Sequence, residues 1–402
     1  MSRLPGYFRR LGRLAQRDHT LAGDYAAGSI VTADMANATF PNRTLGEPNS
    51  NAVPVRHHNF LLNGGMRLAQ RGLTISAPTS GDMTLDRWAT VYQTSGADVS
   101  RSDSTFSTDT RYSMRMSAIA AIGGGKFGVL QILDARRSAQ IYANGTGTAS
   151  LVYRTFNGGS QTITSSGAAI LAWDGTVDAM VRSSLVATWG AKGTNPIFGT
   201  NWTVEGITAA GSTNVDHATF QKVKLENVSL DTSNTKNIAV FIWNDHVDYD
   251  VGDELYLGDI QLETGEGSTH FSELPLEEDL QECQRFYEKT FDADNAPVGA
   301  HVSVDPDPLN RPGVNWFHGF GGGRHIHNWD FLVRKNSRPS ASDVTWFVTA
   351  VLGGASQQDQ TGQFSLDTDL ISERGMSILS TTAARNSNAM KFHGTCETEI
   401  GT

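Results

Sequence analysis

The chain has 402 residues, of which 41 are glycine and 18% are charged. This length accommodates two or three domains, and the composition favours short β-strands joined by turns. The formal net charge of −10 argues against nucleic acid as a partner, because phosphate binding needs a basic surface, and no apolar stretch is long enough to predict membrane insertion.

The first 56 residues are predicted to form an attachment segment. Apolar residues recur at helical spacing near the start with arginines around them, namely Leu4, Phe8, Arg9, Arg10, Leu11, Arg13, Leu14 and Arg17. The pattern fits a solvated basic helix or a frayed terminus, and equally a docking peptide that orders against an acidic surface. No apolar core of a secretory signal follows the arginines. From residue 22 to 54, small and polar residues interrupted by Pro41 and Pro48 indicate an extended linker.

Residues 57–274 have a β pattern throughout. Strand-like segments lie at 140–143, 150–156, 220–225 and 238–243, and turns such as Asn157-Gly158-Gly159 follow them. Many short antiparallel strands in one long domain predict a β-sandwich of the jelly-roll type, and no internal repeat suggests a propeller.

The end of this domain has the clearest pattern in the chain. Four apolar residues alternate with polar ones as inward-facing strand residues do, namely Leu255, Leu257, Ile260 and Leu262. After a glycine-containing exit, apolar residues recur at helical spacing: Leu276, Leu280, Cys283, Tyr287 and Phe291. These patterns predict a last strand and one amphipathic connecting helix over 275–291. Cys283 and Cys396 are expected to be buried, reduced and structural.

Residues 292–402 are predicted to form a small terminal β-domain. Its strand candidates are 316–320, 328–334, 343–351 and 391–395. The expected fold class is therefore all-β: a jelly-roll sandwich, a short helix and a second small β-domain, preceded by the attachment segment.

Several short motifs resemble the C-terminal half of bacteriophage tail-fibre proteins that carry a carbohydrate-binding-module-like jelly roll. They are Asn63-Gly64-Gly65, the run from Arg67 to Gly72, Asp86-Arg87-Trp88, the run from Cys283 to Lys289, the basic run from Phe331 to Lys335 before Arg338-Pro339, and the closing run from Phe392 to Ile400. The resemblance touches residues from about Asn59 to Thr402.

This resemblance implies a receptor-binding protein of the virion tail. It implies that the N-terminus docks on another virion protein, that the chain forms a homotrimer, and that the C-terminal domain contacts host cell-surface polysaccharide. The protein would assemble in the host cytoplasm and be exposed outside the cell. A jelly roll of this kind also implies a structural calcium near the last strand; no other cofactor is expected.

Two groups of residues are candidate metal ligands. Asp245, Asp248, Asp250 and Asp253 offer the carboxylate oxygens that calcium prefers, although their spacing is not that of an EF-hand loop. The alternative is a solvated acidic loop. His325 and His327 lie two residues apart, on one face of a predicted strand, and three copies in a trimer would supply six imidazoles. Exposed or hydrogen-bonded histidines are the alternative.

Glycan recognition by β-sandwiches uses aromatic rings that stack on sugars beside polar groups that bind hydroxyls. The candidates in the terminal domain are Trp316, Arg324, Asn328, Trp329 and Trp346. Core packing is the alternative for each tryptophan. Trp88, Tyr92 and Trp243 in the jelly roll are expected to be core residues.

No catalytic motif occurs: the sequence has no nucleophile elbow, no zinc-protease helix and no phosphate-binding loop. An enzyme is therefore not expected. The leading hypothesis is a non-catalytic tail fibre or spike; the alternatives are a structural head fibre or decoration protein, and a glycan depolymerase.

Overall fold

The computed structural model describes most residues between 59 and 401. The described residues are 39–40, 43–44, 59–94, 97–103, 111–118, 122–123, 125–144, 148–158, 165–211, 220–231, 233–245, 248–249, 251–290, 297, 314–316, 325–347, 364–380 and 390–401. Contacts divide the chain into two units, Met1–Arg56 and His57–Thr402. In the first unit, β1 (Thr39–Phe40) pairs with β2 (Arg43–Thr44). The docking residues expected between Leu4 and Arg17 lie outside the described residues.

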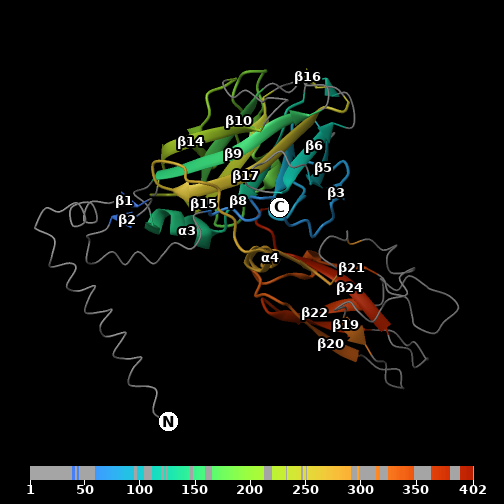
Figure 1. Cartoon of the computed structure of the whole chain (residues 1–402). Helices are drawn as coiled ribbons and strands as arrows, with labels where there is room; N and C mark the ends of the chain where they lie inside the picture. Colours follow the sequence, from blue (N-terminus) through green and yellow to red (C-terminus); the bar gives the residue numbers. More distant parts are fainter. Residues whose placement is uncertain are drawn as a thin grey trace, which may run out of the picture. The chain divides into compact units, whose positions relative to one another are not determined.

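Two antiparallel sheets pack face to face and form a β-sandwich (Figure 1). The five-stranded sheet has the spatial order β13 (Trp202–Ile207), β10 (Ser166–Trp173), β15 (Asn237–Asn244), β8 (Phe127–Ile132), β4 (Ala89–Tyr92). The six-stranded sheet has the order β14 (Gln221–Ser229), β9 (Thr148–Gly158), β17 (Glu254–Thr264), β6 (Ser113–Ala118), β5 (Ala97–Ser102), β3 (Thr74–Ile75). The chain crosses repeatedly between the sheets, which confirms the expected all-β, jelly-roll-like fold.

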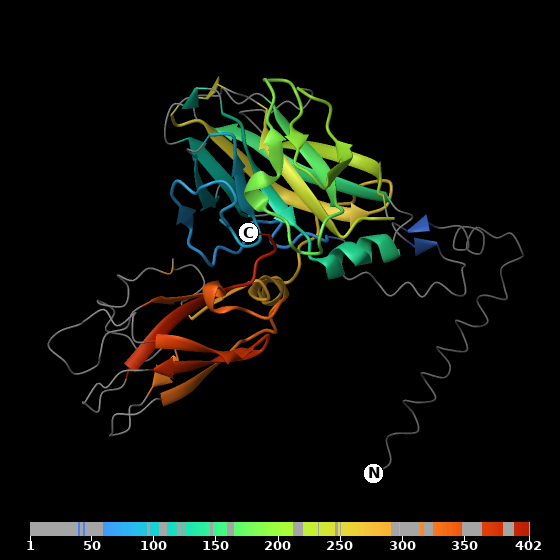
Figure 2. The same cartoon turned by 180° about the vertical axis from the view of Figure 1, so that it is seen from behind.

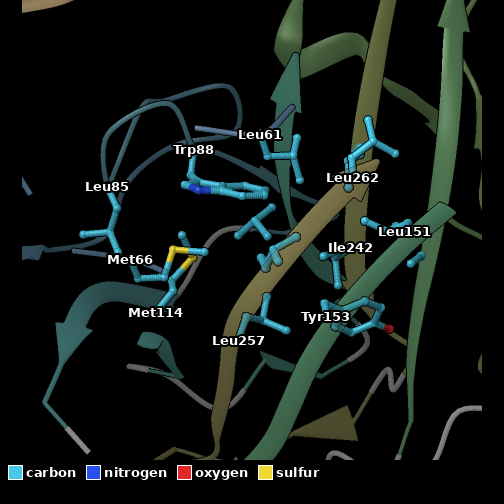
Figure 3. Packing of buried hydrophobic residues seen from close by; sticks show 14 of the residues in the cluster. Leu61, Met66, Leu85, Trp88, Met114, Leu151, Tyr153, Ile242, Leu257 and Leu262 are labelled. Carbon is cyan, nitrogen blue, oxygen red and sulfur yellow. The ribbon is translucent and has the colours of Figure 1, made fainter. Parts of the chain in front are cut away.

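The core lies between the sheets and follows the two-residue period of the strands. In β15, Ile238, Val240 and Ile242 face this core, where Trp88, Leu151 and Leu257 also pack (Figure 3). The alternate residues of β15 are buried as well, because the segment between β10 and β13 covers the outer face of the five-stranded sheet (Figure 2). Burial on both faces explains why β15 is an uninterrupted apolar run. Trp88, Tyr92 and Trp243 are core residues, as expected.

A β-bulge in β17 explains the apolar pattern seen in the sequence. The inward residues change from odd numbers, Leu255 and Leu257, to even numbers, Ile260 and Leu262, yet all four lie in one core. That change requires one extra residue, and the register to β9 shifts between Gly258 and Gln261. Asp259 has a φ of 48°, so the extra residue adopts a left-handed conformation.

The helices differ from the sequence-based expectation. The segment 140–143 is not a strand but part of α3 (Ala135–Asn144), whose first turn is capped because Asp134 Oδ1 accepts a hydrogen bond of 2.6 Å from the Arg137 amide. The connecting helix α4 spans only Leu276–Gln284. It ends before Tyr287 because residues 287–289 form β18 (Tyr287–Lys289), which pairs with a strand of the terminal region. Backbone pairing thus overrides the helical spacing of Tyr287.

Two further sheets form the terminal β-region. In one, β24 (Met390–Glu397) pairs with β18, β19 (Val314–Trp316) and β21 (Val344–Phe347). In the other, β23 (Gly375–Ser380) lies between β20 (His325–Asp330) and β22 (Phe364–Ser372). The strands expected at 316–320, 343–351 and 391–395 overlap β19, β21 and β24 in turn, whereas β20 begins and ends earlier than the segment expected at 328–334.

Three short additions complete the described elements: the pair β7 (Ile122–Gly123) with β16 (Asp248–Tyr249), the pair β11 (Val186–Thr188) with β12 (Ile197–Phe198), and the 3-10 turns η1 (Arg182–Ser184) and η2 (Ala341–Asp343). Cys283 and Cys396 are buried and unbonded. Among the described residues, no helix has the length and apolar character that crossing a membrane requires.

Candidate functional site

The motifs that resemble tail-fibre proteins lie up to about 330 residues apart in the sequence but meet in one buried polar network. Its centre is Glu399, whose side chain is 3% exposed and accepts hydrogen bonds from two arginines. Arg71 Nη2 lies 3.2 Å from Glu399 Oε1, and Arg87 Nη1 bonds Glu399 Oε2. Each guanidinium also stacks on an aromatic ring, Arg71 at 3.9 Å from the centroid of Tyr287 and Arg87 at 3.6 Å from that of Phe286. We call these five residues the junction clamp.

The two arginines of the clamp share Glu399, and Arg71 also pairs with Glu397 outside the clamp at 3.4 Å. Burial alone would lower the pKa of Arg71, but the carboxylates of Glu397 and Glu399 raise it above its usual value. Arg71 therefore stays charged at any physiological pH. Arg87 also donates to the Ile132 carbonyl at 2.6 Å, which fastens the clamp to β8 of the sandwich. Its φ of 70° is a strained conformation that these contacts stabilise.

Asn63 and Asp86 build the sandwich side of the network. The Asn63 side chain accepts a hydrogen bond from the Leu68 amide and donates to the carbonyls of Leu68 and Asp86. The Asp86 carboxylate accepts two hydrogen bonds from Gln70, at 2.7 Å from the backbone amide and 2.6 Å from the side-chain amide. Burial raises the pKa of Asp86, and these bonds partly oppose that rise. The turn residues thus hold Arg71 and Arg87 in place.

Every residue of the run Cys283 to Lys289 has a partner in this junction. The Cys283 side chain packs in the outer core, and the Gln284 carbonyl accepts a 2.7 Å hydrogen bond from Lys335 Nζ. Arg285 donates to Glu282. The rings of Phe286 and Tyr287 lie under the guanidinium groups of Arg87 and Arg71. Glu288 pairs with Lys335 at 2.8 Å, and Lys289 donates to the Gln70 carbonyl. This run therefore joins the sandwich to the terminal β-region. These contacts are those of a structural joint.

A second polar surface lies on the outer face of the six-stranded sheet. One row crosses three strands: Arg115 on β6 is opposite Tyr256 on β17, which is opposite Phe156 on β9. Phe220, just before β14, continues the row, with its ring 5.5 Å from that of Phe156. Tyr256 lies 5.4 Å from Phe156 on the other side, edge to face. We call this row, together with Glu254, the sheet-face site.

The polar groups of the sheet-face site form a connected chain. Tyr256 Oη donates to Glu254 Oε2 at 2.7 Å, and Arg115, which is 39% exposed, pairs with the other oxygen of the same carboxylate. Burial, followed by the Glu254 carboxylate, raises the pKa of Tyr256 to about 12, so its hydroxyl remains a donor. Gly158 lies opposite Glu254, where a Cβ would approach Glu254 Oε2 to 2.7 Å. Glycine therefore makes room for this arrangement.

A second ion pair adjoins the row at the bulge. Arg154 Nε lies 2.7 Å from Asp259 Oδ2, and Lys222 is opposite Arg154 on β14. The bulge therefore gives the outer face an additional carboxylate beside the aromatic row. The sequence did contain a signal for this site, since Arg154 and Phe156, and Glu254 and Tyr256, stand at the outward parity of their strands. The register that brings them together was not readable from the sequence.

Asp245, the first of the expected calcium ligands, is paired with a lysine, and the calcium site stays a prediction. Lys126 is fully buried, and its ammonium group contacts the Ala191 and Thr194 carbonyls at 2.8 and 2.9 Å and Asp245 Oδ1 at 2.5 Å. The other oxygen of Asp245 accepts from the Gly211 amide. A lysine ammonium thus occupies the position beside Asp245 that a cation would take. Asp253 is buried, whereas the Asp248 side chain and Asp250 lie outside the description.

No group of three or more metal-ligating side chains occurs among the described residues. His325 and His327 lie two residues apart in β20, and their side chains are outside the description. The histidine metal site remains a prediction.

The expected glycan residues of the terminal region are only partly described. Trp329 is 4% exposed and packs against Phe331, with ring centroids 5.4 Å apart. It is therefore packed in the interior of this chain and does not fit the exposed platform expected of it. The side chains of Trp316, Asn328 and Trp346, and Arg324 as a whole, lie outside the description, so their role stays a prediction.

The chain matches no protein-family model and no curated protein. Among solved structures it is similar to carbohydrate-binding modules of the β-sandwich superfamily, with 13% identity, a TM-score of 0.30, and coverage of 46% of this chain and 60% of that one. It is also similar to the enzymatically active domain of tailspike protein 4 of bacteriophage CBA120, with 11% identity, a TM-score of 0.28, and coverage of 51% and 21%. A cyclase from Fischerella sp. gives 15% identity, a TM-score of 0.31, and coverage of 52% and 95%. The fold assignment rests on the strand order of this chain rather than on these likenesses.

Proposed function

We propose that this chain is a non-catalytic adhesive protein of a bacteriophage particle, which attaches to the virion through its N-terminal segment and binds surface polysaccharide of the host. The sheet-face site is the proposed glycan contact. The observation that carries the proposal is the row of Arg115, Tyr256 and Phe156 with Glu254 on the outer face of a β-sandwich.

The chemistry of this row suits sugars. Phe156, Phe220 and Tyr256 are only 7–8% exposed and pack against one another, so they support the row, while the Arg115 guanidinium and the Glu254 carboxylate are the groups that would bind sugar hydroxyls. Arg115 is the most exposed member of the row, at 39%, and its guanidinium pairs with Glu254, so this ion pair is the part of the row that a sugar hydroxyl or carboxylate would contact.

The junction clamp supports an adhesive role in a different way. A fibre transmits force between virion and cell, and a buried ion network between two domains resists bending at their junction better than a glycine-rich linker. The resemblance of the clamp motifs to tail fibres accords with this role. The weak binding of each site would be multiplied in an oligomer.

The test is binding of the labelled full chain to host cells and to their purified polysaccharide. Arg115→Ala should weaken binding about tenfold, because a hydrogen bond to a charged group contributes about 1.5–3 kcal/mol. Lys224→Ala is the matched control, since it removes an exposed positive charge from the same sheet, 45% exposed, outside the row. Equal binding by both variants would contradict the proposal.

Two further measurements separate the alternatives. Release of reducing ends from the polysaccharide would identify a depolymerase. A folded chain that is incorporated into particles but does not bind cells would instead be a structural virion protein.

A further inference from the structure

Two tryptophans form a pair at the edge strand β13 of the five-stranded sheet. Trp202 begins the edge strand β13 and is directly opposite Trp173 on β10. Their ring centroids are 5.0 Å apart with an interplanar angle of 54°. Trp173 is 8% exposed and donates from Nε1 to the Thr176 carbonyl at 2.8 Å, whereas Trp202 is partly exposed. The buried ring therefore holds the outer ring in a fixed position at the surface.

Exposed polar side chains lie next to this pair. Asp174 follows Trp173 and Asn201 precedes Trp202, and the Asp174 amide donates to the Asn201 carbonyl at 3.1 Å, so the two residues are held together. Neither side chain bonds another described residue. Val204, two positions beyond Trp202 on the same strand, is 42% exposed. The edge thus presents an indole, an apolar flank, a carboxylate and an amide whose hydrogen-bonding groups are available.

The backbone around the pair is built to present it. Asn201 has a φ of 67°, a left-handed conformation that turns the chain immediately before β13. At Gly175, a Cβ would lie 2.5 Å from Trp173 and 3.0 Å from Asn201 Nδ2, so only glycine lets the turn close against the indole. These constraints fix Trp202, Asn201 and Asp174 in one local arrangement.

We propose that Trp202, with Asn201 and Asp174, forms a second glycan subsite that takes a neutral hexopyranose. The indole provides the stacking surface, the Asn201 amide provides a donor and an acceptor, and the Asp174 carboxylate accepts from hydroxyls. The carboxylate repels uronic acids, so the subsite selects neutral rings. This inference rests on the proposed glycan-binding function and adds a site on the other sheet of the sandwich.

The probes are cellohexaose, mannohexaose and maltohexaose, with hexagalacturonate as the acidic counterpart, titrated calorimetrically into the full chain. At least one neutral hexaose should bind, and hexagalacturonate should bind more weakly. Trp202→Ala should weaken the neutral binding about tenfold or more, as loss of an aromatic anchor does, while Trp202→Phe should retain most of it.

Asn201→Gly is the sharpest variant. Glycine adopts the left-handed conformation without strain, so this change removes the amide and leaves the fold at least as stable. It should weaken binding without lowering the melting temperature. Leu332→Ala, which removes an apolar side chain 77% exposed in the terminal region, is the control and should bind like the parent chain.

The outcomes distinguish the two proposals. If Arg115→Ala weakens binding to host polysaccharide and Trp202→Ala changes no binding, the subsite is wrong and the proposed function stands. If the full chain binds neither the polysaccharide nor any neutral hexaose, both are wrong. If Trp202→Ala alters sedimentation of the oligomer but not sugar affinity, the edge is a contact between copies, and the subsite is also wrong.

Discussion

Replacement of Glu399 by alanine should destabilise the protein more than loss of any exposed acidic residue. Glu399 is 3% exposed, and the side chains of its partners Arg71 and Arg87 are 9% and 4% exposed. The substitution leaves Arg71 with only the carboxylate of Glu397, which is 3.4 Å away and 40% exposed, and leaves Arg87 without an ion-pair partner among the described residues. Removing one partner of a buried ion pair costs about 3–5 kcal/mol, because the remaining charge stays desolvated.

The assay is thermal and urea unfolding of the full chain, with Glu373→Ala as the matched control. Glu373 also pairs with an arginine, Arg334, but the two side chains are 34% and 66% exposed, so this loss should cost about 0–1 kcal/mol. Glu399→Ala should lower the melting temperature by on the order of 10 °C. If the two variants unfold at the same temperature, the junction clamp does not stabilise the fold and its description is wrong.

Substitutions also test three other contacts. Burial raises the pKa of Asp279 to about 6 from 3.8, so the native state binds this proton more tightly than the unfolded state does. The free energy of unfolding should therefore rise by roughly 3 kcal/mol as pH falls from 7.5 toward 4. Asp279→Asn should remove that rise in urea titrations, and an unchanged pH dependence would assign the rise to other groups. Lys126→Met leaves Asp245 buried and unpaired, and should lower unfolding free energy by about 3–5 kcal/mol; a loss below about 1 kcal/mol would show that the ammonium is dispensable. Gly167→Ala places a Cβ 2.2 Å from the buried ring of Trp243 and should lower the free energy of unfolding by about 1–3 kcal/mol or more. The control Gly193→Ala meets no atom within 4 Å and should lower it only by the strain of the left-handed backbone, about 1–2 kcal/mol. A larger loss for Gly193→Ala than for Gly167→Ala would contradict the packing described.

The sequence was sufficient for the architecture of the sandwich because its strands are strongly patterned. The uninterrupted apolar run of β15 and the alternation in β17 identify strands directly. The change of the inward-facing positions from odd to even numbers between Leu257 and Ile260 indicates the bulge. The segment around Ile141 was predicted wrongly as a strand. Its aliphatic and aromatic residues suit a strand or a helix, and the hydrogen bond from the Arg137 amide to Asp134, which caps α3, favours the helix.

The sites were harder to predict because they depend on long-range pairing. Tyr256 becomes part of a site only through its register with Arg115 and Phe156, which lie about 140 and 100 residues earlier. Trp329 stands in a polar segment that suggested exposure, yet packing against Phe331 buries it. Asp245 belongs to an acid-rich stretch, but the partner that neutralises it comes from residue 126. Local composition does not contain such information.

The most direct test of the central claim is titration of purified host-surface polysaccharide with the full chain, its Arg115→Ala variant and the Lys224→Ala control, with reducing ends measured in the same samples. The proposed function predicts saturable binding that Arg115→Ala weakens about tenfold and Lys224→Ala leaves unchanged, without release of reducing ends. Absence of binding, or binding indifferent to Arg115, would contradict a glycan contact at the sheet-face site, and release of reducing ends would contradict a non-catalytic adhesin.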